Sequence, residues 1–295
     1  MRELPIRMAD SFLMKANRTL SVSDLGSFWT SIWDYFVIKA HAPYTSVLDP
    51  STAGNRVEGA RWFAGATLNY AEHCLQRDDH HPAVVAAHES GTFHTTTFAE
   101  LRTQVAAFAA GLRAIGVESG DAVVAYLPNV TEAVVASLAA ASIGAAWSSC
   151  PPEFGTPSVI DRFAQVAPKV LIASDGYTYN GKPFDSLPAV AQIQQGLPTL
   201  ERTIVLPYVA QAADLSGLKD AIAWADVPIA GAELQFEQVA FNHPLYVVYS
   251  SGTTGVPKAI VHGHGGVLIE HFKAMALHMD LGEDDCFFWF TTTGW

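Results

Sequence analysis

The segment Tyr249-Ser250-Ser251-Gly252-Thr253-Thr254-Gly255-Val256-Pro257-Lys258 joins two short apolar runs. The first run, at 245–249, and the second, at 259–262, are rich in β-branched and aromatic residues. Runs of this length and composition predict buried strands. The residues between them therefore have to turn the chain sharply.

This turn brings glycines and hydrogen-bond donors together. Gly252 and Gly255 permit backbone angles that other residues avoid, and they let peptide N–H groups approach a ligand closely. Lys258 adds a positive charge that suits phosphate oxygens, and side-chain hydroxyls come from Ser250, Ser251, Thr253 and Thr254. We predict a polyphosphate-binding loop. An ordinary polar turn is the less favoured alternative, because such a turn seldom needs this many donors and a lysine.

The glycine spacing separates this loop from the loop of P-loop NTPases. That motif needs four residues between its glycines and a Ser or Thr directly after its lysine. Here two residues separate Gly252 from Gly255, and Ala259 follows Lys258. A P-loop NTPase is therefore disfavoured.

From Val247 to Lys258 the sequence resembles the signature loop of the adenylate-forming superfamily, which includes acyl-CoA synthetases, luciferases and peptide-synthetase adenylation domains. The resemblance implies that the loop holds the β- and γ-phosphates of ATP while a carboxylate attacks the α-phosphate. The acyl-adenylate then reacts with coenzyme A. ATP, Mg²⁺ and coenzyme A are thus the implied cofactors and co-substrates. The residues assigned to phosphate binding are Ser250, Ser251, Gly252, Thr253, Thr254, Gly255 and Lys258, with Lys258, Thr253 and Thr254 as the catalytic set.

Other segments resemble the acetoacetyl-CoA synthetases more than the acetyl-CoA synthetases. They are residues 60–70 (ARWFAGATLNY), 147–155 (WSSCPPEFG), 161–163 (DRF), 259–266 (AIVHGHGG) and 287–295 (FFWFTTTGW). The resemblance covers about residues 25–295 and implies acetoacetate as the carboxylate that is activated. Acetate, propionate or a hydroxybutyrate stays open as the alternative.

The same resemblance suggests residues outside the loop. His262, Thr293 and Trp295 would line the acyl pocket, although aromatic residues near the end of the chain are also typical of strand core. Lys182 would meet a coenzyme A phosphate, in a segment where related acetyl-CoA synthetases have arginines and this chain has Tyr179. A solvated loop charge is an equal alternative for Lys182.

Metal coordination by the protein itself is not expected. Histidines and a glutamate gather after the loop, at His262, His264, Glu270, His271 and His278. Their spacing is not that of a zinc site, and no cysteine accompanies them. The three cysteines, Cys74, Cys150 and Cys286, are too scattered for a disulfide framework.

Composition places the chain among soluble α/β proteins of a reducing cytoplasm. Hydrophobic residues make up 49% and charged residues 16%, so a large core can form. A net charge of −12 argues against general binding to nucleic acid or to anionic membranes. The longest apolar run, 133–147, is too short to span a bilayer, and no secretory signal precedes it.

Hydrophobic periodicity predicts alternating strands and helices, and so β-sheets flanked by helices in the N-terminal part of the adenylate-forming fold. We expect a helical region at 1–80 and an incomplete α/β AMP-binding domain at 81–295. Predicted helices cover 25–40, 62–75, 98–115, 131–143, 156–167 and 265–281. Predicted strands, besides the two around the loop, cover 83–87, 93–97, 122–127, 169–173 and 286–290, and loops are expected at 177–200 and 210–242.

Chain length limits the expected activity. Adenylate-forming enzymes of this kind are considerably longer than 295 residues. We therefore expect this chain to be an N-terminal fragment without the C-terminal lid domain, and to need its missing C-terminal half for full activity. A non-catalytic nucleotide-binding module is the alternative if the protein ends naturally at Trp295.

Overall fold

A computed structural model describes residues 21–49, 59–250 and 255–291. The chain divides into two compact units. The first unit contains residues up to Leu68 together with Ala240–Asn242 and Gly265–Phe287. The second contains Asn69–Val239, His243–His264 and the residues from Phe288 onward.

Aromatic packing organises the first unit. Helix α2 (Leu25–Tyr35) precedes the antiparallel strands β1 (Ser46–Asp49) and β2 (Arg61–Ala64), and β3 (Thr67–Leu68) follows. The ring of Phe63 stacks on Trp33 with 4.6 Å between centroids, and it lies 4.9 Å from the ring of Phe241. This unit therefore draws its core from segments far apart in the sequence.

The helix predicted at 62–75 is wrong for most of its length. The chain forms β2 and β3 there, and only α4 (Tyr70–Cys74) is helical. Gly65, with φ of +91°, turns the backbone out of β2, which pairs with β1. A helix cannot pass through a paired strand and a turn of this kind.

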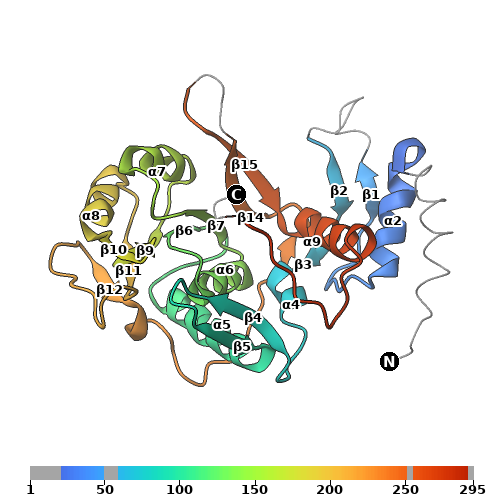
Figure 1. Cartoon of the computed structure of the whole chain (residues 1–295). Coiled ribbons are helices and arrows are strands. Elements are labelled where there is room, and N and C mark those ends of the chain that lie inside the picture. Colours follow the sequence, from blue (N-terminus) through green and yellow to red (C-terminus); the bar gives the residue numbers. More distant parts are fainter. Residues whose placement is uncertain (1–20, 50–58, 251–254, 292–295) are drawn as a thin grey trace. The chain divides into compact units, whose positions relative to one another are not determined.

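A seven-stranded sheet forms the centre of the second unit (Figure 1). Its order is β12 (Ala221–Ala223), β11 (Arg202–Leu206), β8 (Val170–Ser174), β6 (Ala122–Tyr126), β7 (Ala146–Cys150), β14 (Pro244–Ser250) and β15 (Lys258–Gly263). Neighbouring strands are parallel except for β14 and β15, which are antiparallel. Parallel strands covered on both faces are typically continuous apolar runs, and all residues of β8 are buried.

Helices cover both faces of this sheet. α7 (Thr156–Phe163) and α8 (Leu187–Gly196) pack on one face, where Phe163 and Ile193 contact the cluster around Val124 and Leu171. Parallel strands are connected by right-handed crossovers, and β7 and β8 flank β6 on opposite sides, so α6 (Thr131–Ile143) covers the other face. α5 (Phe98–Ala114) lies beside α6 in Figure 1.

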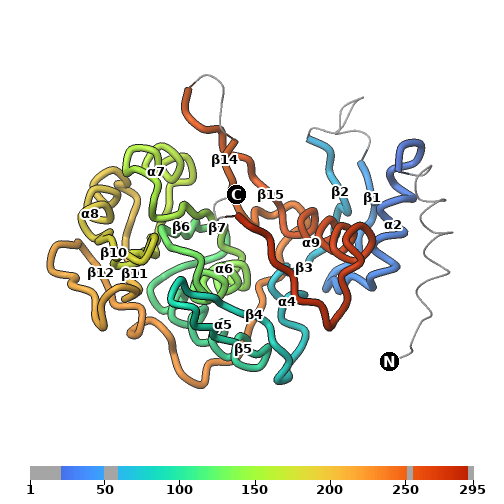
Figure 2. The backbone as a smooth tube through the Cα atoms, viewed as in Figure 1, coloured from blue at the N-terminus to red at the C-terminus, as the bar shows by residue number. Residues whose placement is uncertain are grey.

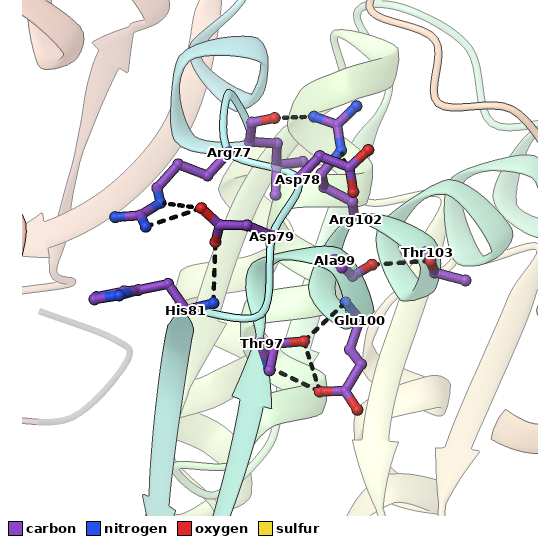
Figure 3. A network of polar contacts seen from close by, with 10 residues as sticks. Arg77, Asp78, Asp79, His81, Thr97, Ala99, Glu100, Arg102 and Thr103 are labelled. Atoms are coloured by element: carbon purple, nitrogen blue, oxygen red, sulfur yellow. Dashed lines mark hydrogen bonds and ion pairs between the residues drawn. The ribbon is translucent and has the colours of Figure 1, made fainter. Parts of the chain in front are cut away.

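A hairpin and a capped helix begin the second unit after α4. β4 (Pro82–Ala87) pairs with β5 (Phe93–Thr97). Thr97 then caps α5: its hydroxyl accepts from Glu100 N–H, and the Glu100 carboxylate accepts from Thr97 N–H at 2.8 Å (Figure 3). Arg102, one turn further along, donates to the Leu75 carbonyl and so ties α5 to the segment after α4.

The stretch 177–200, expected to be loop, is ordered, and that prediction is wrong. β9 (Gly176–Tyr179) and β10 (Lys182–Asp185) form a hairpin, and α8 follows. The turn residues Asn180 and Gly181 have φ of 51° and 72°. Asn-Gly is the preferred pair for such a two-residue hairpin turn, so the sequence did carry the signal.

The predicted strand at 286–290 is also wrong. The described part of the chain has no strand at these positions, and Phe288 and Phe290 are 80% and 94% exposed. A strand needs a partner for its backbone hydrogen bonds. The helix predicted at 265–281 divides into α9 (His264–Phe272) and a π-helical segment η3 (Lys273–His278). Shorter elements are η1 (Ala164–Val166), η2 (Trp224–Asp226) and β13 (Val239–Ala240).

Among the helices that the structure describes, none combines the length and the apolar character that crossing a bilayer requires.

Candidate functional site

The candidate site lies where the parallel strands of the central sheet end. β6, β7, β8 and β14 run in one direction, so their carboxyl ends share one edge of the sheet. The strand order reverses between β6 and β8, because the chain leaves β6 toward β7 on one side and leaves β8 toward β11 on the other. Ligands of open α/β sheets bind at this edge near such a reversal. The predicted phosphate loop follows β14 at this edge.

The two strands around the loop were predicted, and they pair as an antiparallel hairpin with a register shift between Pro244 and Tyr246. Ser250 on β14 pairs with Lys258 on β15, and Tyr249 pairs with Ala259. Gly255 has φ of +110°, which only glycine adopts readily, and both Gly255 and Lys258 are exposed. Figure 2 shows the two arms of the hairpin side by side. The predicted residues Ser251, Gly252, Thr253 and Thr254 lie outside the described residues.

Buried hydrogen bonds support the first strand of the hairpin. The Tyr249 hydroxyl donates to the Arg162 carbonyl on α7 at 2.9 Å, and burial raises the pKa of this tyrosine. The Arg162 guanidinium lies between two rings, 5.8 Å from the centroid of Tyr249 and 5.0 Å from that of Phe154. The Ser148 hydroxyl on β7 donates to the Val247 carbonyl at 2.8 Å. These contacts fix β14 against β7 and α7.

Gln165 supports the second strand. Its side chain, on η1 just after α7, donates from Nε2 to the Pro257 carbonyl at 2.8 Å. Its Oε1 accepts from the Ala259 N–H at 3.3 Å. Both contacts are made to residues adjacent to Lys258.

Two histidines hold the base of the hairpin. His243 directly precedes β14 and donates from Nε2 to the Gly144 carbonyl at 2.7 Å. His264 directly follows β15, and its Nδ1 accepts from the Tyr70 N–H at 3.1 Å. Burial, and secondarily the neighbouring His243, lowers the pKa of His264 from 6.5 to about 3. His264 therefore stays neutral, with a fully buried ring.

His262 lies on β15 at the end away from the loop. Its ring is 5.0 Å from that of Tyr246, its pairing partner on β14, and burial lowers its pKa. His262 lies four residue steps along the strand from Lys258, which corresponds to about 13 Å. The structure thus does not bring His262 together with the phosphate loop.

Lys182 lies on β10, opposite Tyr179, and is exposed. β9 follows β8 directly, so this hairpin starts from the same edge of the sheet as the phosphate loop. Three strand spacings separate β8 from β14, or about 14 Å. The Glu89 carboxylate accepts from the N–H groups of Asn180 and Gly181 at 3.1 and 2.8 Å and so holds the turn beside Lys182.

Thr293 and Trp295 also lie outside the described residues. The last described residue, Thr291, accepts through its carbonyl from Asn129 Nδ2 at 3.0 Å. Asn129 follows β6, so the chain reaches the carboxyl edge of the sheet at Thr291.

A cavity of about 250 Å³ lies at the opposite ends of the strands. Trp147 near the start of β7 and Leu245 near the start of β14 line it, together with residues of α6 and the ring of Tyr70. It is mostly apolar and distinct from the phosphate loop. Within the described ranges, no three His, Cys, Asp or Glu side chains gather closely enough to hold a metal ion.

Sequence reasoning missed the residues that support the loop. Arg162 and Ser148 lie in segments that carried the family resemblance, but their contacts with the hairpin depend on the packing of α7 and β7. Gln165 carried no local signal. Tyr249 was predicted as strand, and its hydroxyl contact was not.

Comparison with known proteins gives the class. The AMP-binding enzyme family matches residues 71–295, and the acetyl-coenzyme A synthetase N-terminus family matches residues 14–74. The chain belongs to the AMP-binding enzyme family.

The particular relatives narrow this class. Acetoacetyl-CoA synthetase of Gallus gallus is 41% identical over 284 residues, which is 93% of this chain and 42% of that protein. Acetoacetyl-coenzyme A synthetase of Rhizobium meliloti is 40% identical over 279 residues, with the same two coverages. The solved structure of acetoacetyl-CoA synthetase from Streptomyces lividans superposes with a TM-score of 0.87 at 48% identity, covering 94% of this chain and 42% of that one. The chain thus spans less than half the length of the relatives it matches.

Proposed function

We propose that the protein is an acetoacetate–CoA ligase that works through an acyl-adenylate. It would convert ATP, acetoacetate and coenzyme A into AMP, diphosphate and acetoacetyl-CoA. The observation that carries the proposal is the hairpin in which Ser250 and Lys258 close a Gly- and hydroxyl-rich loop at the carboxyl edge of the sheet. Similarity to acetoacetyl-CoA synthetases along 93% of the chain supports the choice of acid.

Charge determines what the loop has to do. A carboxylate attacking the α-phosphate brings two anions together, and diphosphate leaves with additional negative charge. Catalysis then depends on positioning and on electrostatic stabilisation more than on proton transfer. Lys258, Thr253 and Thr254 would serve as catalytic residues, with the hydroxyls of Ser250 and Ser251 and the backbone of Gly252 and Gly255 binding the β- and γ-phosphates.

Mg²⁺ would enter as part of the substrate Mg·ATP. Phosphate oxygens of ATP would be among its ligands. Mg²⁺ neutralises phosphate charge when it is bound, and Lys258 contributes a second positive charge at the exit of the loop.

The remaining assignments concern individual binding residues, the location of the protein and its partners. Lys182 would bind a phosphate of coenzyme A from the β9–β10 turn, and His262, Thr293 and Trp295 would belong to the acyl pocket. We also place the protein in the cytoplasm, with small molecules rather than nucleic acid or membranes as its partners. The net charge of −12 argues against general binding to nucleic acid or to anionic membranes.

A substrate panel tests the proposal. The complete product of the gene is assayed for CoA-dependent release of AMP with acetoacetate, acetate, propionate and 3-hydroxybutyrate, each with and without Mg·ATP. We expect AMP with acetoacetate in clear preference to the others. Preference for another acid would retain the chemistry and overturn the substrate. No AMP with any acid would favour a non-catalytic nucleotide-binding module.

A further inference from the structure

One face of α7 and η1 contacts both strands of the phosphate-loop hairpin. Arg162 accepts through its carbonyl from the Tyr249 hydroxyl of β14. Gln165, three residues later, contacts the start of β15 through both ends of its amide. Both strands of the hairpin are thus contacted by α7 and the η1 segment that follows it.

The two Gln165 contacts enclose Lys258. The Pro257 carbonyl belongs to the peptide group before the Lys258 Cα, and the Ala259 N–H belongs to the peptide group after it. The two peptide planes around a Cα define its φ and ψ. A side chain that holds both planes therefore fixes the direction in which the Lys258 side chain leaves the backbone.

The two Gln165 contacts reach the outer side of β15, the strand that begins with Lys258. β15 is the edge strand of the sheet, and β14 is its only neighbouring strand among the described elements. Peptide groups on the outer side of an edge strand lack ladder partners. Gln165 provides one donor and one acceptor, which is the combination that an amide side chain can offer to such groups.

The support itself is anchored. Gln165 Nε2 also donates to the Asp161 carbonyl one turn earlier at 2.8 Å. Phe163 of α7 is fully buried in the core with Leu171 and Ile193. The amide therefore projects from a segment that is fixed to the sheet.

We propose that Gln165 is a positioning residue that sets the orientation of Lys258 for the phosphates of ATP. The proposal rests on the proposed function of the loop. Its sharpest consequence is energetic coupling: the effect of removing Gln165 should disappear once Lys258 has been removed.

A double-mutant cycle in the complete gene product measures this coupling. Gln165→Ala, Lys258→Ala and the double variant are compared in acetoacetate-dependent exchange of labelled diphosphate into ATP. When Lys258 is present, we expect Gln165→Ala to lower the exchange rate about 10-fold. In the Lys258→Ala background, we expect it to lower the rate less than about 2-fold. Gln165→Glu, which keeps the acceptor for Ala259 N–H and loses the donor to Pro257, should fall between wild type and Gln165→Ala. Gln195→Ala, on the exposed side of α8, serves as the matched control and should match wild type.

The proposal would be overturned if Gln165→Ala lowered the diphosphate exchange rate by the same factor with Lys258 present and with Lys258 replaced by alanine. So would an exchange rate for Gln165→Ala equal to that of the Gln195→Ala control.

Hydrogen exchange separates this proposal from the proposed function. If wild type shows no diphosphate exchange, the ligase function fails, and amide exchange across 255–263 then decides the role of Gln165. If amide hydrogen exchange across 255–263 is faster in Gln165→Ala than in Gln195→Ala, at equal thermal stability, this would support the role of Gln165 in positioning Lys258. Equal exchange would contradict it.

Discussion

Ser250 and Lys258 lie opposite one another across the antiparallel pair β14 and β15. The residues between them leave the sheet and return to it at the same level. The positive charge of Lys258 is therefore placed at the exit of a loop rich in glycine and hydroxyl groups. The paired strands of the hairpin stem set this position.

Replacing Lys258 should slow formation of the acyl-adenylate more than the later formation of the thioester. In the complete enzyme, Lys258→Ala is expected to reduce adenylate formation on the order of 100-fold, or about 3 kcal/mol, because a preorganised charge at the departing diphosphate is lost. Thioester formation from added acyl-adenylate should change far less. Rapid-quench measurements of the two steps check this, with Lys219→Ala, an exposed lysine after β11, as the control. Equal slowing of both steps would argue against the assigned role.

Val37 and Gly116 offer a matched pair at the ends of two helices. Both close a Schellman motif: Val37 N–H donates to Asp34 O after α2, and Gly116 N–H donates to Arg113 O after α5. Their φ angles are 49° and 93°, in the region that favours glycine.

The two substitutions should act in opposite directions. Val37 is 82% exposed, so Val37→Gly removes strain with little loss of packing and should raise the free energy of unfolding by roughly 0.5 to 1 kcal/mol. Gly116→Val should lower it by about 1 to 2 kcal/mol. Urea unfolding measures both effects. A loss of stability in Val37→Gly would contradict the proposed backbone strain at Val37.

Asn69 connects α4 to two distant segments. Its buried Nδ2 donates to the Ala141 carbonyl at 2.9 Å and to the Glu237 carbonyl at 2.8 Å, while its Oδ1 caps α4 at Ala71 N–H. Asn69→Ala leaves these groups without this partner and should cost roughly 2 to 4 kcal/mol of unfolding free energy. Asn129→Ala, at an exposed site, should cost less than about 0.5 kcal/mol. Equal effects of the two substitutions in chemical denaturation would refute this role.

The buried His264 should make stability depend on pH. Its folded pKa of about 3 lies below the 6.5 of the unfolded chain, so between these values the unfolded state binds the additional proton. Its contribution is complete above pH 6.5 and is lost as the pH falls toward 3. For this residue alone, lowering the pH from about 7 to 5.5 should cost about 1 kcal/mol.

A variant isolates this contribution from the carboxylates that titrate in the same range. His264→Asn should show a smaller loss of unfolding free energy over that interval than wild type, whereas His94→Asn, at an exposed position, should match wild type. Identical pH profiles for all three proteins would show that His264 does not carry the effect.

Much of the second unit could be predicted because its elements have local signals. α6 was predicted at 131–143 and has those bounds, since Gly144, with φ of 80°, ends it. α2 ends at Tyr35, earlier than the predicted residue 40, because Val37 adopts the left-handed conformation without a glycine to announce it. β2 was missed because it has only four residues and these residues also fit a helical pattern.

Part of the candidate site could likewise be predicted from the sequence. The two strands, the sharp turn between them and Lys258 follow from one contiguous segment. Gln165 and His264 could not be assigned from sequence, because their roles depend on which segments the fold brings against the hairpin. Cavities, buried histidines and supporting amides arise from tertiary contacts and leave no periodic pattern.

The path of a single oxygen atom tests the proposed chemistry. The complete enzyme is given Mg·ATP, coenzyme A and acetoacetate with heavy oxygen in its carboxylate, and the products are examined by mass spectrometry. Attack of the carboxylate on the α-phosphate predicts one heavy oxygen in AMP. AMP without the label, or label in inorganic phosphate with formation of ADP, would contradict an acyl-adenylate and the role proposed for the loop between Ser250 and Lys258.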